Sequence, residues 1–345
     1  MPQAEHLQAF VNLGELFTRF YENPNDTFNG WRPQLEIVIE QAEVHNPWYT
    51  KENIAFCLLH WGQLLTEQNL NKWYTSYRYS NNEHKIAIVM AGNIPLVGFH
   101  DFLAVLLSGH SVLAKLSSND RVLLPFVVKF LNEQDPSLSQ KIELTEGRLQ
   151  DFDAVIATGS NNTARYFEYY FKKYPSIIRK NRNSIAVLDG NETPENLTHL
   201  AQDIFRYFGL GCRSVSKLYV PKGYRFDTFF ESIFEWKDLL DHHKYVNNYD
   251  YNKAVYLMSE LNILDNGFLI VKEDKGKASP IGTLFYEEYD SLKELSNQLS
   301  EEAEELQCIV SNCGLPSEIG FGTSQIPALS DYADSVDTMK FLVGL

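Results

Sequence analysis

Short apolar runs alternate with amphipathic stretches from about residue 85 onward. The runs at 85–90 (KIAIVM), 111–115 (SVLAK), 154–157 (AVIA) and 184–188 (SIAVL) have the length and composition of buried strands. Small or polar residues follow each run, and the chain then takes on helical periodicity. Because strands that alternate with helices are typical of parallel sheets, the pattern predicts an α/β architecture.

The first run shows the pattern in most detail. Gly92 and Asn93 follow it as a turn, and Pro95 is expected in the first turn of a helix. Gly109 is expected to end that helix as a C-cap glycine. The polar cluster 117–120 (SSND) is expected to cap the next helix, because these side chains accept bonds from free N–H groups.

The remaining elements follow from the same periodicity. Residues 1–80 look mostly helical, with breaks expected at Pro24, Pro33 and Pro47. Helices are expected at 161–173, 193–209 and 292–306, and strands at 217–220, 268–271, 283–286 and 308–310. The predicted organisation is a helical N-terminal region (1–80), two α/β domains (81–185 and 186–325) and a C-terminal tail (326–345).

Composition narrows the class of protein. The formal net charge of -15 argues against a nucleic-acid binder, which needs a basic face. The longest apolar stretch, near 102–107, is far too short to span a membrane, and the N-terminus does not look like a signal peptide. Four cysteines in 345 residues do not make a disulfide scaffold. We therefore expect reduced thiols and a cytoplasmic location.

Cys212 is the first candidate for chemistry. It lies in the segment FGLGCRS, between a predicted helix and a predicted strand. Glycines on both sides let a ligand approach the backbone, and nearby N–H groups favour a reactive thiolate. The alternative is a buried loop cysteine, and the local sequence does not separate the two.

Three further positions follow predicted strands. Asn93 could donate its amide to a developing oxyanion, the turn Thr158–Ser160 could bind a pyrophosphate with its N–H groups, and Lys115 ends a strand at the ligand edge of the sheet. Each alone is also an ordinary turn or surface residue. The chain has no G-x-G-x-x-G fingerprint and no metal-ligand spacing. Core or capping roles are favoured for His100 and His110.

Taken together, the chain resembles the aldehyde dehydrogenase superfamily, and within it the LuxC-type acyl-CoA reductases. The resemblance lies in the order of four segments, AGNIPLVGFHDFLAVLLSGHSVLAKLSSND, ATGS, NSIAVLDG and FGLGCRSVSKLYVP. It covers roughly residues 80–345, and residues 1–80 are compatible with it. The family fold it implies has two parallel α/β domains, a Rossmann-like cofactor domain and a catalytic domain.

The resemblance also implies a role for each candidate residue. Cys212 falls on the cysteine that accepts the acyl group, and Asn93 on the asparagine that shares the oxyanion with that cysteine's N–H. Lys115 falls on the lysine that contacts the adenosine ribose, with Ser117 and Ser118 beside it. The turn Thr158, Gly159 and Ser160 falls on the pyrophosphate site. The superfamily binds its dinucleotide without G-x-G-x-x-G.

Two departures from the wider superfamily refine the expectation. Hydrolytic members carry a Glu base in a segment that corresponds here to 177–183 (IIRKNRN), which has no carboxylate. A thioester without a general base resists water and can be reduced instead. NAD-preferring members carry an acid where this chain has Ser118. Its absence favours NADPH, with Arg121 as a partner for a 2′-phosphate. NADH is the alternative, because Asp120 lies only two positions after Ser118 and could take the role of that acid.

The expected function is reduction of a fatty acyl-CoA, or another acyl thioester, to the aldehyde through a Cys212 acyl-enzyme. The alternatives are an aldehyde dehydrogenase that works oxidatively and an acyl-binding protein without redox activity. The family further implies an acyl-activating synthetase and an acyltransferase as partners. Homo-oligomerisation is left open.

Overall fold

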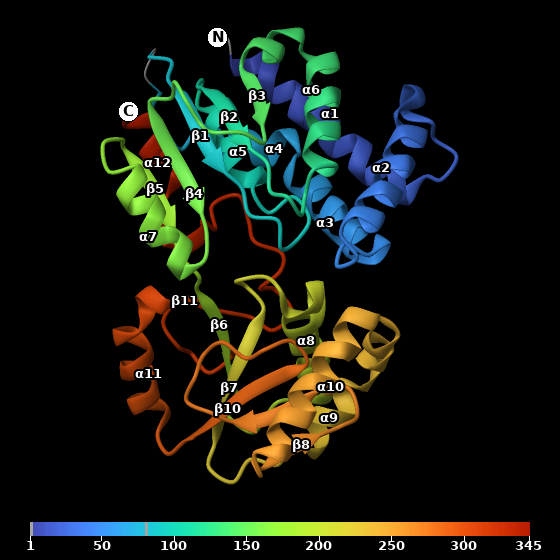
Figure 1. Cartoon of the computed structure of the whole chain (residues 1–345), viewed down its shortest axis with the longest axis vertical. Helices are drawn as coiled ribbons and strands as arrows, with labels where there is room; N and C mark the ends of the chain where they lie inside the picture. The colour runs from blue at the N-terminus through green and yellow to red at the C-terminus, as the bar shows by residue number, and fades with distance from the viewer. Residues whose placement is uncertain (1–2, 80–81) are drawn as a thin grey trace. The chain divides into compact units, whose positions relative to one another are not determined.

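The computed structural model describes residues 3–79 and 82–345. Contacts divide the chain into two units, Met1–Lys180 with Ala328–Leu345, and Asn181–Pro327. Each unit is built on one sheet covered by helices (Figure 1). The predicted architecture of two parallel α/β domains is confirmed.

The first unit has a five-stranded, fully parallel sheet in the order β3-β2-β1-β4-β5. Its strands are β1 (Lys85–Val89), β2 (Ser111–Lys115), β3 (Ile142–Thr145), β4 (Ala154–Thr158) and β5 (Ser176–Arg179). The chain moves from β1 outward to β3, then crosses to the other side of β1 and continues with β4. The point where the order reverses therefore lies between β1 and β4, and such points bind ligands at the carboxyl ends of the strands.

Helices surround this sheet. They are α1 (Gln3–Glu22), α2 (Trp31–His45), α3 (Lys51–Leu64), α4 (Glu67–Tyr74), α5 (Phe99–Leu107), α6 (Leu123–Gln134), α7 (Asn161–Tyr170) and α12 (Thr338–Val343), with 3₁₀ turns at Phe28–Gly30, Pro136–Gln140 and Ala333–Ser335. The helical character expected for residues 1–80 is confirmed where the structure describes them. The break expected at Pro33 is wrong, because this proline lies in the first turn of α2, where its missing N–H costs no bond.

Helix α5 is the most buried helix of the unit. Every residue of α5 except the half-buried His100 is buried. It begins at Phe99, so the expectation that Pro95 lies in its first turn is wrong. The intervening residues form turns in which Leu96 has a φ of 51°.

The end of α5 follows the prediction. Gly109 has a φ of 92°, which a residue with a Cβ adopts only at a cost. Its N–H donates to Leu106 O at 3.1 Å, and the N–H of His110 donates to Val105 O at 3.2 Å. These two bonds are those of a Schellman motif and satisfy carbonyls that the helix end leaves open.

The second unit has a seven-stranded sheet in the order β12-β11-β6-β7-β10-β9-β8, parallel except for β8 against β9. Its strands are β6 (Asn183–Val187), β7 (Val215–Pro221), β8 (Ile263–Asp265), β9 (Ile270–Glu273), β10 (Thr283–Tyr289), β11 (Leu306–Val310) and β12 (Glu318–Ile319). Its helices are α8 (Pro194–Phe205), α9 (Asp227–Ser232), α10 (His243–Met258) and α11 (Leu292–Glu301), with 3₁₀ turns at Arg206–Gly209, Phe234–Asp241 and Ala303–Glu305.

Helix α11 covers one face of this sheet, and α8, α9 and α10 lie on the other side (Figure 1). Leu295 and Leu299 of α11 pack on Ile185, Val187 and Tyr219 of β6 and β7. These five residues alternate along strands or lie on one helix face, as their periodicity requires. Burial of such side chains stabilises the unit by about 1.5–3 kcal/mol each.

The helix expected at 193–209 is shorter than predicted. Thr193 caps α8 in a reciprocal capping box with Asn196, which confirms the predicted start. The helix ends at Phe205, and a 3₁₀ turn follows in which Tyr207 and Phe208 are left-handed. Helices α9, α10 and α12 and strands β3, β5, β8 and β12 were not predicted.

Candidate active site

The carboxyl edge of the five-stranded sheet brings together the predicted cofactor residues of the first unit. Val89, the last residue of β1, is paired with Lys115 of β2 on one side and with Ala157 of β4 on the other. Asn93 follows β1, and Thr158 ends β4. These segments therefore meet where the strand order reverses, which is the usual ligand position in such sheets.

The loop after β1 lies directly against the loop after β2. The N–H of Met90 donates to Lys115 O at 3.1 Å. A Cβ added to Gly92 would lie 2.4 Å from Ser117 Oγ and 2.7 Å from Ser117 Cβ. Any larger residue at position 92 would force Ser117 to move, so glycine at this position allows the Asn93 loop to lie directly against Ser117.

Residues 117–120 form a compact turn. Ser117 and Asp120 make an isolated bridge, and the N–H of Asn119 donates to Ser117 Oγ at 3.2 Å. Helix α6 starts only at Leu123 and has no side-chain cap, so the expectation that this cluster caps it is wrong. Ser118 is exposed, and its carbonyl accepts a bond from His45 Nε2 of α2 at 2.8 Å. The N-terminal helical region thus supports this turn.

Asp120 points inward from the same turn. It is 8% exposed and accepts the N–H of Leu96 at 3.2 Å. Burial raises the pKa of this carboxyl above its ordinary value. Asp120 therefore holds the loop between β1 and α5, and the exposed part of the turn carries serine and asparagine.

The turn after β4 leads directly into α7. The N–H of Gly159 donates to Arg179 O at 3.2 Å, and Ser160 caps the helix by accepting the N–H of Thr163 at 3.2 Å. The bonds of these two residues fix the start of α7 against β5. The positive end of the helix dipole then lies at this turn, where an anion is stabilised.

Cys212 lies in the second unit, in the turn between the 3₁₀ segment and β7. Of the four cysteines it is exposed, whereas Cys57 and Cys308 are buried and Cys313 is half-buried. Its carbonyl accepts the Ser184 hydroxyl at 2.9 Å. Ser184 is fully buried in β6, so this bond fixes the backbone of the turn to the sheet.

Three left-handed residues precede this turn. Tyr207, Phe208 and Gly209 have φ values of 55°, 57° and 74°, and both aromatic side chains are buried. Phe208 packs on His242 with a centroid distance of 4.3 Å. Left-handed conformations at non-glycine residues cost free energy and persist only where packing enforces them. The packing of Phe208 therefore helps to set the path of the chain toward Cys212.

The Gly/Ser-rich segment 320–325 is held beside the same turn. The buried carboxylate of Asp203 accepts the N–H groups of Gly322 at 2.6 Å and Ser324 at 2.9 Å. Gln325 donates to Ser214 Oγ, two residues after Cys212, at 3.3 Å. Neither Asp203 nor Ser184 was a candidate from the sequence, because a buried polar residue has no signature in a single chain.

The segment that lacks a general base has a defined structural role. Arg179 is buried and donates to both carboxylate oxygens of Asp101, and its bond to Oδ1 is 2.8 Å long. It also donates to Thr338 Oγ1 of α12 at 2.9 Å. Although burial raises the pKa of Asp101, the Arg179 charge and its bonds hold that pKa below its ordinary value. The pair is therefore ionised.

Comparison with protein families now adds to this geometry. Residues 51–231 match the model of the LuxC acyl-CoA reductase family, which is just over half of the chain. This chain belongs to the LuxC family. The match includes Asn93, Lys115, the turn Thr158–Ser160 and Cys212. Comparison with curated proteins gives no match.

Solved structures that resemble this LuxC-family chain include aldehyde dehydrogenases. Aldehyde dehydrogenase 21 from Physcomitrella patens, bound to succinate, has a TM-score of 0.69 at 12% identity and covers 100% of this chain and 84% of its own. An NAD-dependent benzaldehyde dehydrogenase from Corynebacterium glutamicum has 0.63 at 12%, covering 90% and 76%. The NAD+ complex of a Bacillus cereus aldehyde dehydrogenase has 0.61 at 14%, covering 90% and 71%. These similarities confirm the predicted aldehyde dehydrogenase-like fold.

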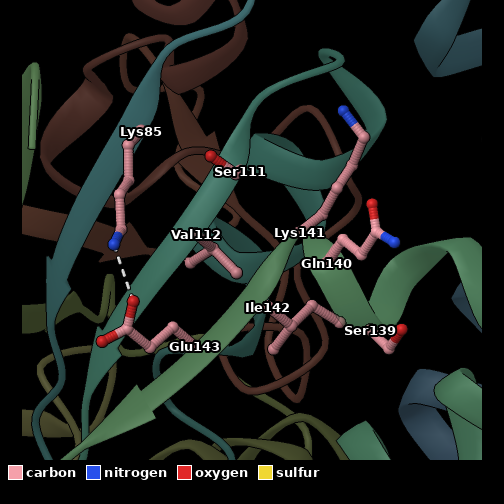
Figure 2. A pocket seen from close by; sticks show the side chains of 8 residues that line it. All are labelled: Lys85, Ser111, Val112, Ser139, Gln140, Lys141, Ile142 and Glu143. Carbon is pink, nitrogen blue, oxygen red and sulfur yellow. Dashed lines mark hydrogen bonds and ion pairs between the residues drawn. The ribbon is translucent and has the colours of Figure 1, made fainter.

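A hollow of about 340 Å³ lies elsewhere on the LuxC-family chain, along the amino ends of β1, β2 and β3. Figure 2 shows the side chains that line it. Its charges are paired, Lys85 with Glu143 at 2.6 Å and Lys141 with Glu83 at 3.0 Å. It lies at the opposite edge of the sheet from Asn93 and is not lined by any predicted site residue.

Over residues 3–79 and 82–345, no cluster of three or more His, Cys, Asp or Glu side chains could hold a metal ion. Over the same residues, no helix combines the length and the apolar character that crossing a bilayer demands. Family and fold together support an oxidoreductase of acyl-CoA and aldehyde chemistry.

Proposed function

We propose that this chain reduces a fatty acyl-CoA, or a related acyl thioester, to the aldehyde with NADPH, through an acyl-enzyme on Cys212. The observation that carries the proposal is Cys212 itself. It is the exposed cysteine, it lies in a turn anchored by Ser184, and it falls within the residues that match the acyl-CoA reductase family.

The chain's own groups account for the acylation step. The Cys212 thiolate attacks the thioester carbonyl, a new C–S bond forms, and the bond to the CoA sulfur breaks, so that CoA leaves as a thiolate. The Cys212 N–H and the predicted Asn93 amide stabilise the oxyanion that forms in between. A nicotinamide dinucleotide supplies the hydride when bound. The proton taken up by the released thiolate or by the aldehyde oxygen comes from solvent.

The carboxyl edge of the first unit fits a dinucleotide. The close approach of Gly92 to Ser117 forms a turn with an exposed Ser118, and the N-terminal end of α7 offers a positive dipole. Lys115, Ser117 and Ser118 would hold the adenosine ribose, and Thr158, Gly159 and Ser160 the pyrophosphate.

The same turn supports NADPH over NADH. The nearest carboxylate in sequence, Asp120, is buried and bonded to the Leu96 N–H, so it does not compete with a 2′-phosphate. Arg121 lies at the exposed end of the turn in an ion pair with Glu146 at 3.1 Å. Both side chains are about half exposed, so water screens this pair and a phosphate could replace the carboxylate.

The structure also bears on the direction of the reaction. The segment 177–183, which the resemblance sets against the one that carries the hydrolytic base, has no carboxylate, and its Arg179 is buried and paired with Asp101. A general base typically accelerates such a step by about 10²–10⁴-fold, so water should release the acyl group slowly. This supports reduction over the oxidative alternative. The synthetase and acyltransferase partners and the cytoplasmic location stay predictions.

The test is NADPH oxidation and aldehyde formation against a panel of acyl-CoA chain lengths, with NADH in parallel. Cys212→Ala should lower the rate by at least about 10³-fold, while the matched control Cys313→Ala should keep it. Acid production from aldehydes without CoA would favour the oxidative alternative. Acylation without oxidation of either cofactor would favour the acyl-binding protein. Wild-type rates in Cys212→Ala would refute the acyl-enzyme.

A further inference from the structure

The residues that follow Asn93 are held by side chains from the N-terminal helical region. The Tyr49 hydroxyl donates to Ile94 O at 2.8 Å. The Cys57 thiol donates to Pro95 O at 3.3 Å. Tyr49 and Cys57 are 1% and 5% exposed, so water does not compete for either bond. Two successive carbonyls beside Asn93 therefore depend on buried donors from a distant part of the chain.

The backbone of this loop is strained. Leu96 is left-handed, with a φ of 51°, and its side chain is buried. Its N–H donates to the buried Asp120 at 3.2 Å. A left-handed residue with a Cβ persists only where its surroundings enforce that conformation. The bonds at Ile94, Pro95 and Leu96 are part of those surroundings, and together they set the path of residues 92–96.

Tyr49 lies in a corner that is fixed by bonds of its own. The corner is the segment 46–50, which joins α2 to α3. The N–H of Tyr49 donates to Asn46 O at 2.8 Å, and the N–H of Trp48 donates to Asn46 Oδ1 at 3.2 Å. On the other side of Tyr49, Thr50 caps α3. The backbone that carries the Tyr49 ring is therefore held on both sides.

The same part of the chain also contacts the predicted cofactor turn, through different residues. His45 Nε2 is bonded to Ser118 O at 2.8 Å, and Asn46 Nδ2 donates to Asn119 O at 3.3 Å. Tyr49 contacts the loop after β1, whereas His45 and Asn46 contact the turn after β2. A change confined to the Tyr49 hydroxyl should therefore affect the first of these segments and spare the second.

We propose that Tyr49 is a positioning residue for Asn93 in the acylation of Cys212. The inference rests on the proposed function, in which the Asn93 amide stabilises the oxyanion. An oxyanion donor acts in full only when it is held near its final position before the reaction. Tyr49 is too buried to touch a substrate, so it acts by fixing the carbonyl of Ile94, the residue next to Asn93.

Tyr49→Phe tests the proposal because it removes the hydroxyl and keeps the ring. The readout is release of CoA in a single turnover without NADPH, with the acyl-CoA of the panel that the wild type reduces fastest. The rate should fall about tenfold, because the Ile94 carbonyl loses its donor and the loop can shift. Removal of the oxyanion donor itself, in Asn93→Ala, should cost about 10²–10³-fold.

A second readout separates the two segments that this part of the chain contacts. The Kd for NADPH, measured by fluorescence titration, should stay within about twofold of wild type in Tyr49→Phe, because His45 and Asn46 still hold the cofactor turn. The matched control is Tyr79→Phe. It removes a hydroxyl bond of the same length, 2.8 Å, to the carbonyl of Tyr74, and should keep the wild-type rate of CoA release.

A double-mutant cycle distinguishes positioning from a general loss of structure. If Tyr49 acts through Asn93, then Tyr49→Phe should have no further effect on CoA release in the Asn93→Ala background. A merely structural defect would slow both backgrounds by the same factor. Rates are compared at a temperature at which thermal unfolding shows every variant to be folded.

Cys57 gives a second test of the same loop, which serves if Tyr49→Phe does not fold. Cys57→Ala should slow CoA release, and Cys57→Ser, which keeps a donor for Pro95 O, should restore much of the rate. In that case a wild-type rate in Cys57→Ala overturns the inference.

The outcomes separate this inference from the proposed function. A wild-type rate in Tyr49→Phe, an equal fall in Tyr79→Phe, or equal factors in the two Asn93 backgrounds overturns the inference and leaves the Cys212 acyl-enzyme standing. A wild-type rate of CoA release in Asn93→Ala overturns the role proposed for Asn93, and this inference with it.

Discussion

Replacing Asp101 by asparagine tests the energetics of the buried ion pair between Asp101 and Arg179. Asp101 and Arg179 have side chains that are 6% and 7% exposed, so solvent screening is weak. Asp101→Asn keeps the volume and one acceptor but leaves the Arg179 charge without its counterion. Breaking a buried pair from one side typically costs about 3–5 kcal/mol.

Urea unfolding followed by tryptophan fluorescence measures this cost. Four of the five tryptophans, Trp31, Trp48, Trp61 and Trp73, belong to the first unit, so the signal reports mainly on the unit that contains the pair. With an m-value of about 2 kcal/mol/M, the midpoint should fall by roughly 1.5–2.5 M. The double variant Asp101→Asn, Arg179→Met should be more stable than Asp101→Asn, because it removes the uncompensated charge.

The pH dependence follows from the sign of the pKa shift. The pKa of Asp101 is lower in the folded protein than in the unfolded chain, where it is about 3.9. The stabilisation is therefore fully present above that value and is lost as the pH falls through the folded pKa. The difference between wild type and Asp101→Asn should be constant near neutrality and shrink in acid. A midpoint within about 0.3 M of wild type at neutral pH would contradict this account.

Three further predictions concern the turns of the candidate site. Ser184→Ala removes the donor to the Cys212 carbonyl, a bond worth about 0.5–1.5 kcal/mol. It should lower turnover and alter the rate at which iodoacetamide alkylates Cys212. Ser184→Thr keeps the hydroxyl and should restore both. Asp203→Asn should lower the free energy of unfolding by about 1–3 kcal/mol and speed deuterium exchange at 320–325. Since burial raises the pKa of Asp203, its contribution to wild-type stability should decline as the pH rises through that pKa. A stability that does not change with pH in this range would contradict the assignment. Gly92→Ala forces Ser117 aside and should raise the Kd for NADPH about tenfold by fluorescence titration, whereas in Gly147→Ala the new Cβ would meet only Thr145 Oγ, at 3.5 Å, and the Kd should not change.

Elements with strong local patterns could be predicted from the sequence. The strand at 111–115 and the C-cap at Gly109 were found because an apolar run and a glycine at a helix end each reflect local physics. The prediction that Pro95 lies in the first turn of the helix was wrong, because a proline is also common in the turn that precedes a helix. The polar cluster 117–120 misled for a similar reason, since Ser, Asn and Asp favour turns as well as caps.

Other features depend on tertiary contacts that no local pattern contains. Strand β5 is partly polar and is a strand because β4 pairs with it. The role of Arg179 depends on Asp101 and Thr338, which lie 78 and 159 positions away in the chain. Ser184 and Asp203 are buried polar residues whose partners are backbone groups of distant turns. Cys212 could be chosen from the sequence because it lies in one of the ordered segments that resemble the family. The bond from Ser184 that holds its backbone could not be predicted.

Mass spectrometry of the acyl-enzyme tests the central claim most directly. The wild-type protein is mixed with an acyl-CoA in the absence of NADPH, digested and mapped. The acyl group should be found on the peptide that contains Cys212, should persist in water, and should leave as aldehyde when NADPH is added. An acyl group on Cys57, Cys308 or Cys313, or one that is released as acid at the same rate with and without NADPH, would contradict the account.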